Sequence, residues 1–157
     1  MPKIKYRYEE LSADEFVCYE ICKNVGSNTE IKGGVRKEDL QQLCDKKNIP
    51  YSKYATKDEV FGTLLDNGFT CEQLAKMLGV GVFGKLYRDT FNLDANDIRR
   101  LENHGVLKVV GWRRVRVFDH WRDAKIYDPY QFERMTDEDM KELLKKYPPR
   151  KRSCKKS

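Results

Sequence analysis

Residues 97–118 read DIRRLENHGVLKVVGWRRVRVF, and this stretch decides the fold that the sequence predicts. Its first part completes a helix expected over 95–103, and Gly105 suits the position just past the helix end because glycine tolerates a left-handed backbone. Two short strands are expected next, at 106–110 and 113–118, where apolar and basic residues alternate. The chain is therefore predicted to pass from helix to β-hairpin at Gly105.

The alternation also predicts the hairpin register. For the apolar side chains to share one face, Val109 must oppose Val115 and Leu107 must oppose Val117, which requires an odd-numbered loop at 111–113. The loop then carries an indole and a guanidinium at its tip, and three cations line the outer face. The candidate phosphate contacts of this predicted wing are Lys108, Trp112, Arg113, Arg114 and Arg116. The alternative is a hairpin that only packs, with its arginines paired to Asp119 or Asp123.

Charge is concentrated rather than spread. The chain of 157 residues has 31 Lys+Arg and 25 Asp+Glu, a net charge of +6, but the tail at 148–157 supplies five of these cations and no acid. Overall basicity is therefore a weak indication of an anionic partner, and the acid-free run at 108–116 is a stronger one. The tail is either a solvated end or an arm that tracks phosphates through Arg150, Lys151 and Arg152.

The remaining pattern predicts a mainly α protein with a small β-hairpin. Besides the helix at 95–103, apolar spacing predicts helices over 13–24, 36–47, 57–67, 71–79, 82–91 and 137–147, with an irregular aromatic stretch at 119–135. The predicted caps are Ser12 with Glu15, Thr56 with Glu59, Thr70, Asp94, and Thr136 with Asp139. The expected organisation is an N-terminal helix and linker (1–34), a two-helix unit (35–68), a third unit (69–135), a C-terminal helix (136–147) and the basic tail (148–157).

The two-helix unit VRKEDLQQLCDKKNIPYSKYATKDEVFGTLLDNG, at 35–68, joins two apolar helices through an extended connector after Ile49-Pro50. It resembles the SAP-type helix–extended-loop–helix module. The resemblance implies nucleic-acid binding through the connector and the second helix's N-terminus, where amides attract phosphate. The positions concerned are Ser52, Lys53, Tyr54, Thr56 and Lys57. The alternative is a pair of helices that only packs.

Further along, FTCEQLAKMLGV at 69–80 resembles the opening of a helix-turn-helix, and the Arg-Leu-Glu helix end before Gly105 resembles the junction in winged-helix regulators. The resemblance implies a winged-helix-like domain in which one of the helices 82–91 and 95–103 enters a major groove. The candidate contacts on these two helices are Lys85, Arg88, Arg99 and Arg100.

Motifs for chemistry are missing from the sequence. It contains no Walker loop, no dinucleotide fingerprint and no recognisable nucleophile motif, so neither an enzyme nor a cofactor is expected. Cys18 and Cys22 share helical spacing but lack further ligands nearby, so no metal is expected. No apolar stretch suits a membrane span or a secretory leader.

The sequence therefore predicts a non-enzymatic nucleic-acid-binding protein, for DNA rather than RNA, located in the cytoplasm. Its small basic modules are similar to those of phage or mobile-element proteins, which would place it in the bacterial cytoplasm or nucleoid. Two alternatives stay open: a protein-interaction module that regulates or inhibits a host or defence protein, and an RNA-binding assembly protein. A mimic of DNA would be acidic, and this chain is basic.

Overall fold

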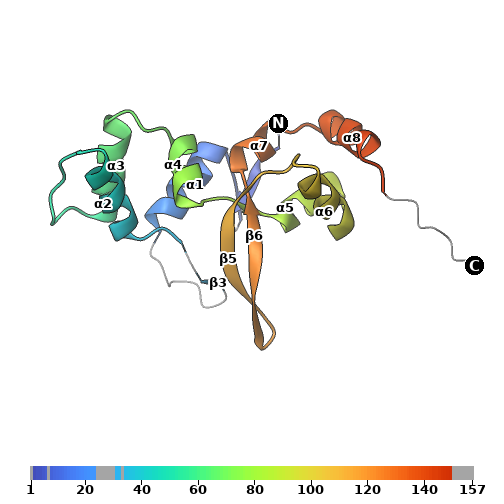
Figure 1. Ribbon diagram of the computed structural model, residues 1–157, viewed down its shortest axis with the longest axis horizontal. Coiled ribbons are helices and arrows are strands. Elements are labelled where there is room, and N and C mark those ends of the chain that lie inside the picture. Colours follow the sequence, from blue (N-terminus) through green and yellow to red (C-terminus); the bar gives the residue numbers. More distant parts are fainter. Residues whose placement is uncertain (1, 7, 24–30, 33, 150–157) are drawn as a thin grey trace, which may run out of the picture.

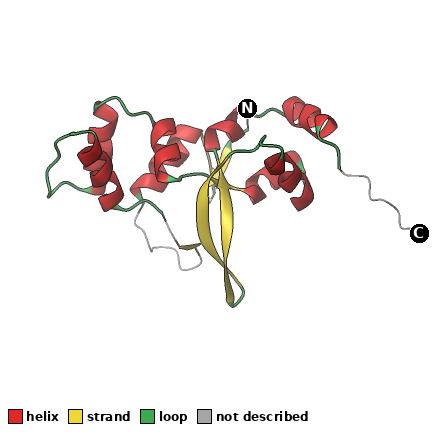
Figure 2. Ribbon diagram, viewed as in Figure 1, coloured by secondary structure: helices red, strands yellow, loops and turns green. Residues whose placement is uncertain are grey.

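The computed structural model describes residues 2–6, 8–23, 31–32 and 34–149 (Figure 1). Within these ranges the chain is mixed α/β and mainly helical (Figure 2). The helices are α1 (Ala13–Cys22), α2 (Lys37–Lys46), α3 (Lys57–Asp66), α4 (Cys71–Leu78), α5 (Gly84–Phe91), α6 (Ala95–Asn103), α7 (Pro129–Arg134) and α8 (Asp137–Lys146). The strands are β1 (Ile4–Tyr6), β2 (Glu9–Leu11), β3 (Ile31–Lys32), β4 (Val82–Phe83), β5 (Val109–Val117) and β6 (His120–Tyr127).

Helix starts follow the predicted cap chemistry. Before α3, the Thr56 hydroxyl accepts a hydrogen bond from the Glu59 amide at 3.2 Å, and the Glu59 carboxylate accepts one from the Thr56 amide. This reciprocal pair satisfies two amides that the helix itself leaves unpaired. The same capping box opens the helices that follow Ser12, Thr70, Asp94 and Thr136.

The predicted hairpin is wrong in its strands and its turn. Strand β5 runs without a break from Val109 to Val117, and its partner is β6, which pairs Val117 with His120 around a two-residue turn at 118–119. Gly111, expected in the loop, lies within β5 beside a register shift. A Cβ atom there would lie 3.4 Å from the Gly79 Cα, so this part of β5 lies against the end of α4 and does not form a turn.

Two other segments also differ from the prediction. The stretch at 119–135 is strand β6 followed by α7, not irregular chain. The helix predicted over 82–91 begins only at Gly84, because Val82 and Phe83 form β4 and pair with the end of β6. The sheet therefore has the order β3-β5-β6-β4, with every neighbouring pair antiparallel, and it is larger than the predicted hairpin.

A single buried cluster connects the elements from β1 to α8, with α1 in contact with α3, α4 and α7. Its aromatic centre lies under the sheet, where the Tyr87 and Phe132 rings meet edge to face at 5.0 Å. Helices α2 and α3 lie at one end of the molecule and α5, α6 and α8 at the other (Figure 1). The β5–β6 hairpin projects from between them, and its turn lies beyond the helices.

Candidate nucleic-acid interface

The strand β5 separates its side chains into two faces. Trp112, Arg114 and Arg116 are exposed, whereas the alternate residues Arg113 and Val115 are half-buried. Strand residues two apart point the same way, so only the first three are directed toward solvent. Trp112, predicted at the wing tip, instead lies at the base of the hairpin, opposite Lys125.

Arg113 is also not at the tip, where it was predicted, and its side chain lies against the end of α4. Its guanidinium donates hydrogen bonds to the Gly79 carbonyl at 2.7 Å and to the Trp112 carbonyl at 2.9 Å. Gly79 caps the C-terminus of α4, where carbonyls carry partial negative charge and favour a cation. Burial lowers the pKa of Arg113, while the charge of Glu20 opposes that shift. Arg113 therefore fastens the hairpin to α4.

A groove of about 760 Å³ lies between the base of the hairpin and helices α5 and α6. Its walls bring together three predicted helix residues, Lys85, Arg88 and Arg99, with Trp112 from β5. Strand β6 adds cations that the sequence analysis did not single out, Arg122 and Lys125. The lining contains a single acidic residue, Asp123, and this carboxylate lies 3.8 Å from the Arg114 guanidinium. The groove is therefore strongly cationic; we call it the basic groove.

The wall between the hairpin and α6 is held by Glu102. One of its carboxylate oxygens accepts a hydrogen bond from the Lys125 ammonium, and the other accepts one from the Tyr127 hydroxyl at 3.2 Å. Lys125 also lies over the Trp112 ring, 5.4 Å from its centroid, in a cation–π contact. Burial and the neighbouring Glu102 charge raise the pKa of Tyr127 to about 12. Lys125 is thus part of the scaffold.

The other four groove cations have no such anchor. Lys85, Arg88, Arg99 and Arg122 are all exposed, and none forms an ion pair with a residue that the structure describes. Four exposed and unpaired cations around one groove attract an anion more strongly than isolated surface charges do, because their fields add.

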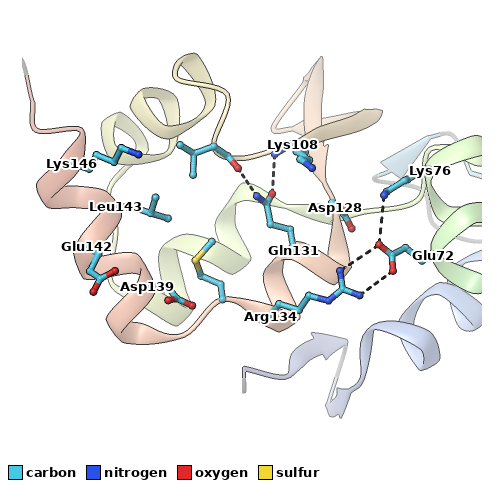
Figure 3. A pocket seen from close by; sticks show the side chains of 12 residues that line it. Glu72, Lys76, Lys108, Asp128, Gln131, Arg134, Asp139, Glu142, Leu143 and Lys146 are labelled. Atoms are coloured by element: carbon cyan, nitrogen blue, oxygen red, sulfur yellow. Dashed lines mark hydrogen bonds and ion pairs between the residues drawn. The ribbon is translucent and has the colours of Figure 1, made fainter.

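A second pocket, of about 620 Å³, provides a contrast (Figure 3). It lies among α4, α7 and α8, and its charged lining is balanced: Lys76, Lys108, Arg134 and Lys146 against Glu72, Asp128, Asp139 and Glu142. Lys108, predicted on the wing, lies here just before β5, and its amide donates to Gln131 at 3.0 Å. The equal charges make this pocket a poor phosphate site.

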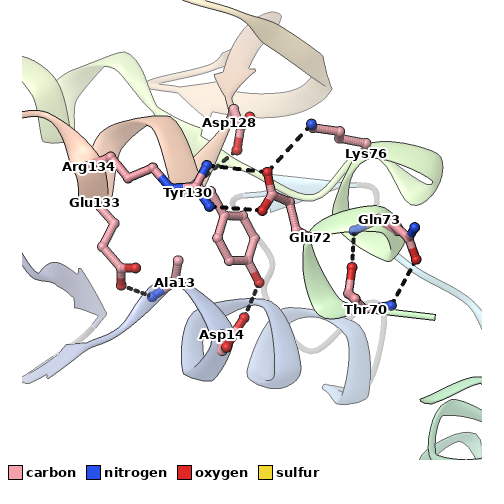
Figure 4. A network of polar contacts seen from close by, with 10 residues as sticks. All are labelled: Ala13, Asp14, Thr70, Glu72, Gln73, Lys76, Asp128, Tyr130, Glu133 and Arg134. Atoms are coloured by element: carbon pink, nitrogen blue, oxygen red, sulfur yellow. Dashed lines mark hydrogen bonds and ion pairs between the residues drawn. The ribbon is translucent and has the colours of Figure 1, made fainter. Parts of the chain in front are cut away.

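The polar contacts beside that pocket join three helices (Figure 4). The Arg134 guanidinium of α7 donates to both oxygens of Glu72 on α4, and this pairing holds the pKa of Glu72 below its usual range. The Tyr130 hydroxyl donates to Asp14 on α1, and burial together with this bond raises the pKa of Tyr130. These contacts orient the helices that support the hairpin.

The SAP-like positions lie at the opposite end of the molecule from the basic groove (Figure 1). Lys53 and Tyr54 are exposed, with the ammonium 5.0 Å from the ring centroid. Lys57 donates to the carbonyls of Lys23 and Val35, and burial lowers its pKa. The Ser52 hydroxyl accepts a hydrogen bond from the Tyr54 amide at 3.2 Å, and Thr56 caps α3. Lys57 and Thr56 therefore have structural partners.

Two groups of predicted contacts remain. Arg100 is held by Asp97 at 2.9 Å and by the Tyr147 carbonyl at 3.0 Å, so it joins α6 to the end of α8. The tail cations Arg150, Lys151 and Arg152 lie outside the described residues.

The β6 residues were missed because their stretch was interpreted as irregular. The sequence did contain a signal, because Trp121, Ala124 and Ile126 are apolar residues that lie among charged ones. Their spacing of three and then two positions matches a half-exposed strand if the strict two-residue alternation is broken once.

Comparisons with known proteins identify no relative of the chain. No family model matches the sequence, no curated protein matches it and no solved structure matches its fold. Among the described residues no helix is long and apolar enough to cross a membrane, and no group of three or more His, Cys, Asp or Glu is placed to hold a metal ion.

Proposed function

We propose that the protein binds duplex DNA, without catalysis, by holding the phosphate backbone in the basic groove. The observation that carries this proposal is the convergence of Lys85, Arg88, Arg99 and Arg122, from two helices and a hairpin, around one groove. Phosphate contacts of this kind supply most of the affinity of a non-specific complex and orient a specific one.

The order of elements supports a winged-helix-like interpretation of this unit. Helix α4, strand β4, helices α5 and α6 and the β5–β6 hairpin follow one another, and β4 pairs with β6. Two successive helices and a hairpin thus border the same groove. The wing of this proposal is the β5–β6 hairpin with its turn at 118–119, in place of the predicted loop at 111–113.

The location of these basic side chains on helices favours duplex DNA over RNA as the partner. The major groove of B-form DNA admits a helix, whereas that of A-form RNA is too deep and narrow for side chains to read. Arg99 is the exposed cation of α6, and Lys85 and Arg88 are those of α5. A complex that uses both helices with the hairpin requires the wider groove.

The SAP-like connector is not part of the proposed DNA-binding face. The first turn of α3 carries Asp58 and Glu59, whose carboxylates repel a phosphate from the helix N-terminus. Lys57, the first residue of α3, already donates hydrogen bonds to two backbone carbonyls.

The test is a salt titration of duplex DNA binding. The variant Lys85→Ala/Arg88→Ala/Arg122→Ala removes three groove cations, and its slope of log affinity against log salt is expected to fall by about 2.7, or about 0.9 for each phosphate neutralised by one of these cations. The matched control Lys46→Ala/Lys47→Ala/Lys141→Ala removes three exposed cations elsewhere and changes net charge equally. Its slope is expected to stay near that of the unaltered chain.

Equal slopes for the two triple variants would contradict the groove as the binding site. Competition with structured RNA and single strands at two salt concentrations separates the alternatives. Stronger competition by RNA favours the assembly role, and no competition by any nucleic acid favours the protein-interaction role.

A further inference from the structure

The turn of the hairpin carries an exposed aromatic ring where packing does not require one. Phe118 is 91% exposed, and its backbone φ is +56°. A bulky residue rarely occupies this left-handed region, and Asn or Gly usually takes such a position in a two-residue turn. The backbone conformation of Phe118 is therefore unfavourable for a phenylalanine, and burial of the ring does not offset this cost in the free protein.

The turn is held in shape by a neighbouring cation. The Arg116 Nε donates to the Phe118 carbonyl at 3.1 Å, and Val117 and His120 close the last strand pair. The exposed ring therefore stands on an ordered base, with Arg116 on one strand and Arg122 on the other. Asp119 is the one acidic residue of the turn, and the next acid, Asp123, pairs with Arg114.

The reach of the hairpin matches the dimensions of DNA. Phe118 follows Trp112, which lies at the basic groove, by six positions along the chain, which corresponds to about 20 Å of strand. A half-turn of B-DNA is about 17 Å long, so the next minor groove lies about this far along the duplex from a helix that sits in the major groove. The hairpin also points away from the helices, so its turn is free to approach the duplex (Figure 1).

From this geometry we infer that Phe118 is a wedge that enters the minor groove of duplex DNA and inserts between two base pairs. Apolar side chains at the tips of minor-groove-binding elements unstack a base step and bend the duplex, and flanking arginines neutralise the adjacent phosphates. Here Arg116, which bonds the turn itself, is placed for that second task. The inference rests on the proposed function, because the basic groove must first hold the duplex.

The test uses the full chain and a duplex that contains 2-aminopurine, whose fluorescence rises when its base step is unstacked. Binding of the unaltered chain is expected to raise the fluorescence. Phe118→Asn removes the ring and suits the left-handed turn, so the fold is retained. It is expected to abolish the fluorescence rise and weaken binding by about 10-fold, the scale of one base–aromatic stack, without changing the salt slope.

Two further variants sharpen the result. Phe118→Leu keeps an apolar wedge and is expected to retain part of the fluorescence rise. Tyr8→Ala is the matched control, because it removes another fully exposed ring, from the segment between β1 and β2, and it is expected to change neither affinity nor fluorescence.

Several results would overturn the wedge. One is unchanged affinity and fluorescence in Phe118→Asn while the triple groove variant loses its salt slope, which would leave the proposed function standing. Another is a preference of the unaltered chain for single strands that disappears with Phe118→Asn, since the ring would then stack on unpaired bases. If the unaltered chain fails to bind duplex DNA, the proposed function fails first.

Discussion

Replacing Arg113 with alanine tests whether this residue stabilises the fold or belongs to the proposed DNA-binding face. Its guanidinium makes two hydrogen bonds to carbonyls, at 2.7 and 2.9 Å, and the side chain is half-buried between β5 and the end of α4. Buried hydrogen bonds that involve a charged group contribute about 1.5–3 kcal/mol each, but partial exposure lowers this contribution to about 1 kcal/mol for each of the two bonds. We expect Arg113→Ala to lower the free energy of unfolding by about 2 kcal/mol.

The assay is urea unfolding followed by circular dichroism, combined with the salt titration of duplex binding. A loss of about 2 kcal/mol corresponds to a melting temperature lower by about 4–8 °C in a chain of this size. Arg113→Lys keeps the charge but not the planar fork, so it is expected to be destabilised as well. The comparison variant Arg122→Ala should stay within about 0.5 kcal/mol in stability and lose about 0.9 of the salt slope. The reasoning is refuted if Arg113→Ala unfolds normally and loses the slope instead.

Three further predictions concern packing and thiol chemistry. Tyr87 is completely buried and its hydroxyl lacks a partner among the described residues, so Tyr87→Phe should raise the free energy of unfolding by about 1 kcal/mol in a thermal melt. Gly81→Ala would place a Cβ 2.4 Å from a β6 carbonyl oxygen and should lower the free energy of unfolding by about 2–3 kcal/mol. Gly62→Ala, whose Cβ would meet nothing within 4 Å, should raise the free energy of unfolding by about 0.5–1 kcal/mol. Burial, with Asp58 nearby, raises the pKa of Cys22 to about 12, so this thiol stays protonated at pH 8 and should alkylate slowly with iodoacetamide until urea unfolds the chain, as followed by mass spectrometry.

Helix starts were predictable because their chemistry is local. A capping box needs only the cap residue and the residue three positions later, and both are visible in the sequence. The pairs Ser12 with Glu15 and Thr56 with Glu59 therefore located α1 and α3 correctly. Their side-chain roles depend on neighbours only within one helical turn, and tertiary packing did not override them.

The hairpin was not predictable in the same way, because its register depends on distant backbone. The prediction required the apolar residues of 107–117 to share a face and took Gly111 as a turn. In the structure that glycine lies against Gly79, an approach that only the tertiary fold brings about. The actual turn begins with Phe118, a residue that turn statistics disfavour. No local rule points to a phenylalanine there.

The basic groove shows why charge counting along the sequence does not reveal which cations lie together. The acid-free run at 108–116 was interpreted as one surface, but its members separate in space. Lys108 faces a pocket with balanced charge, Arg113 fastens β5 to α4, and Arg114 pairs with Asp123. Strand pleating and the bulge at Gly111 cause this separation, because neighbouring residues point to opposite faces.

The cations that do converge come from segments whose local charge is ordinary. Lys85 and Arg88 are one helical turn apart, Arg99 follows on α6, and Arg122 lies between acids at 119 and 123 on β6. What distinguishes them is that the fold gathers them around one groove, where none of the four forms an ion pair with a described residue. By contrast, Asp97 pairs with Arg100 and Glu102 pairs with Lys125. Net charge therefore says little about where this protein would hold an anion. The convergence of unpaired cations in space, which only the fold determines, is the property that selects the groove and hence the variants that test it.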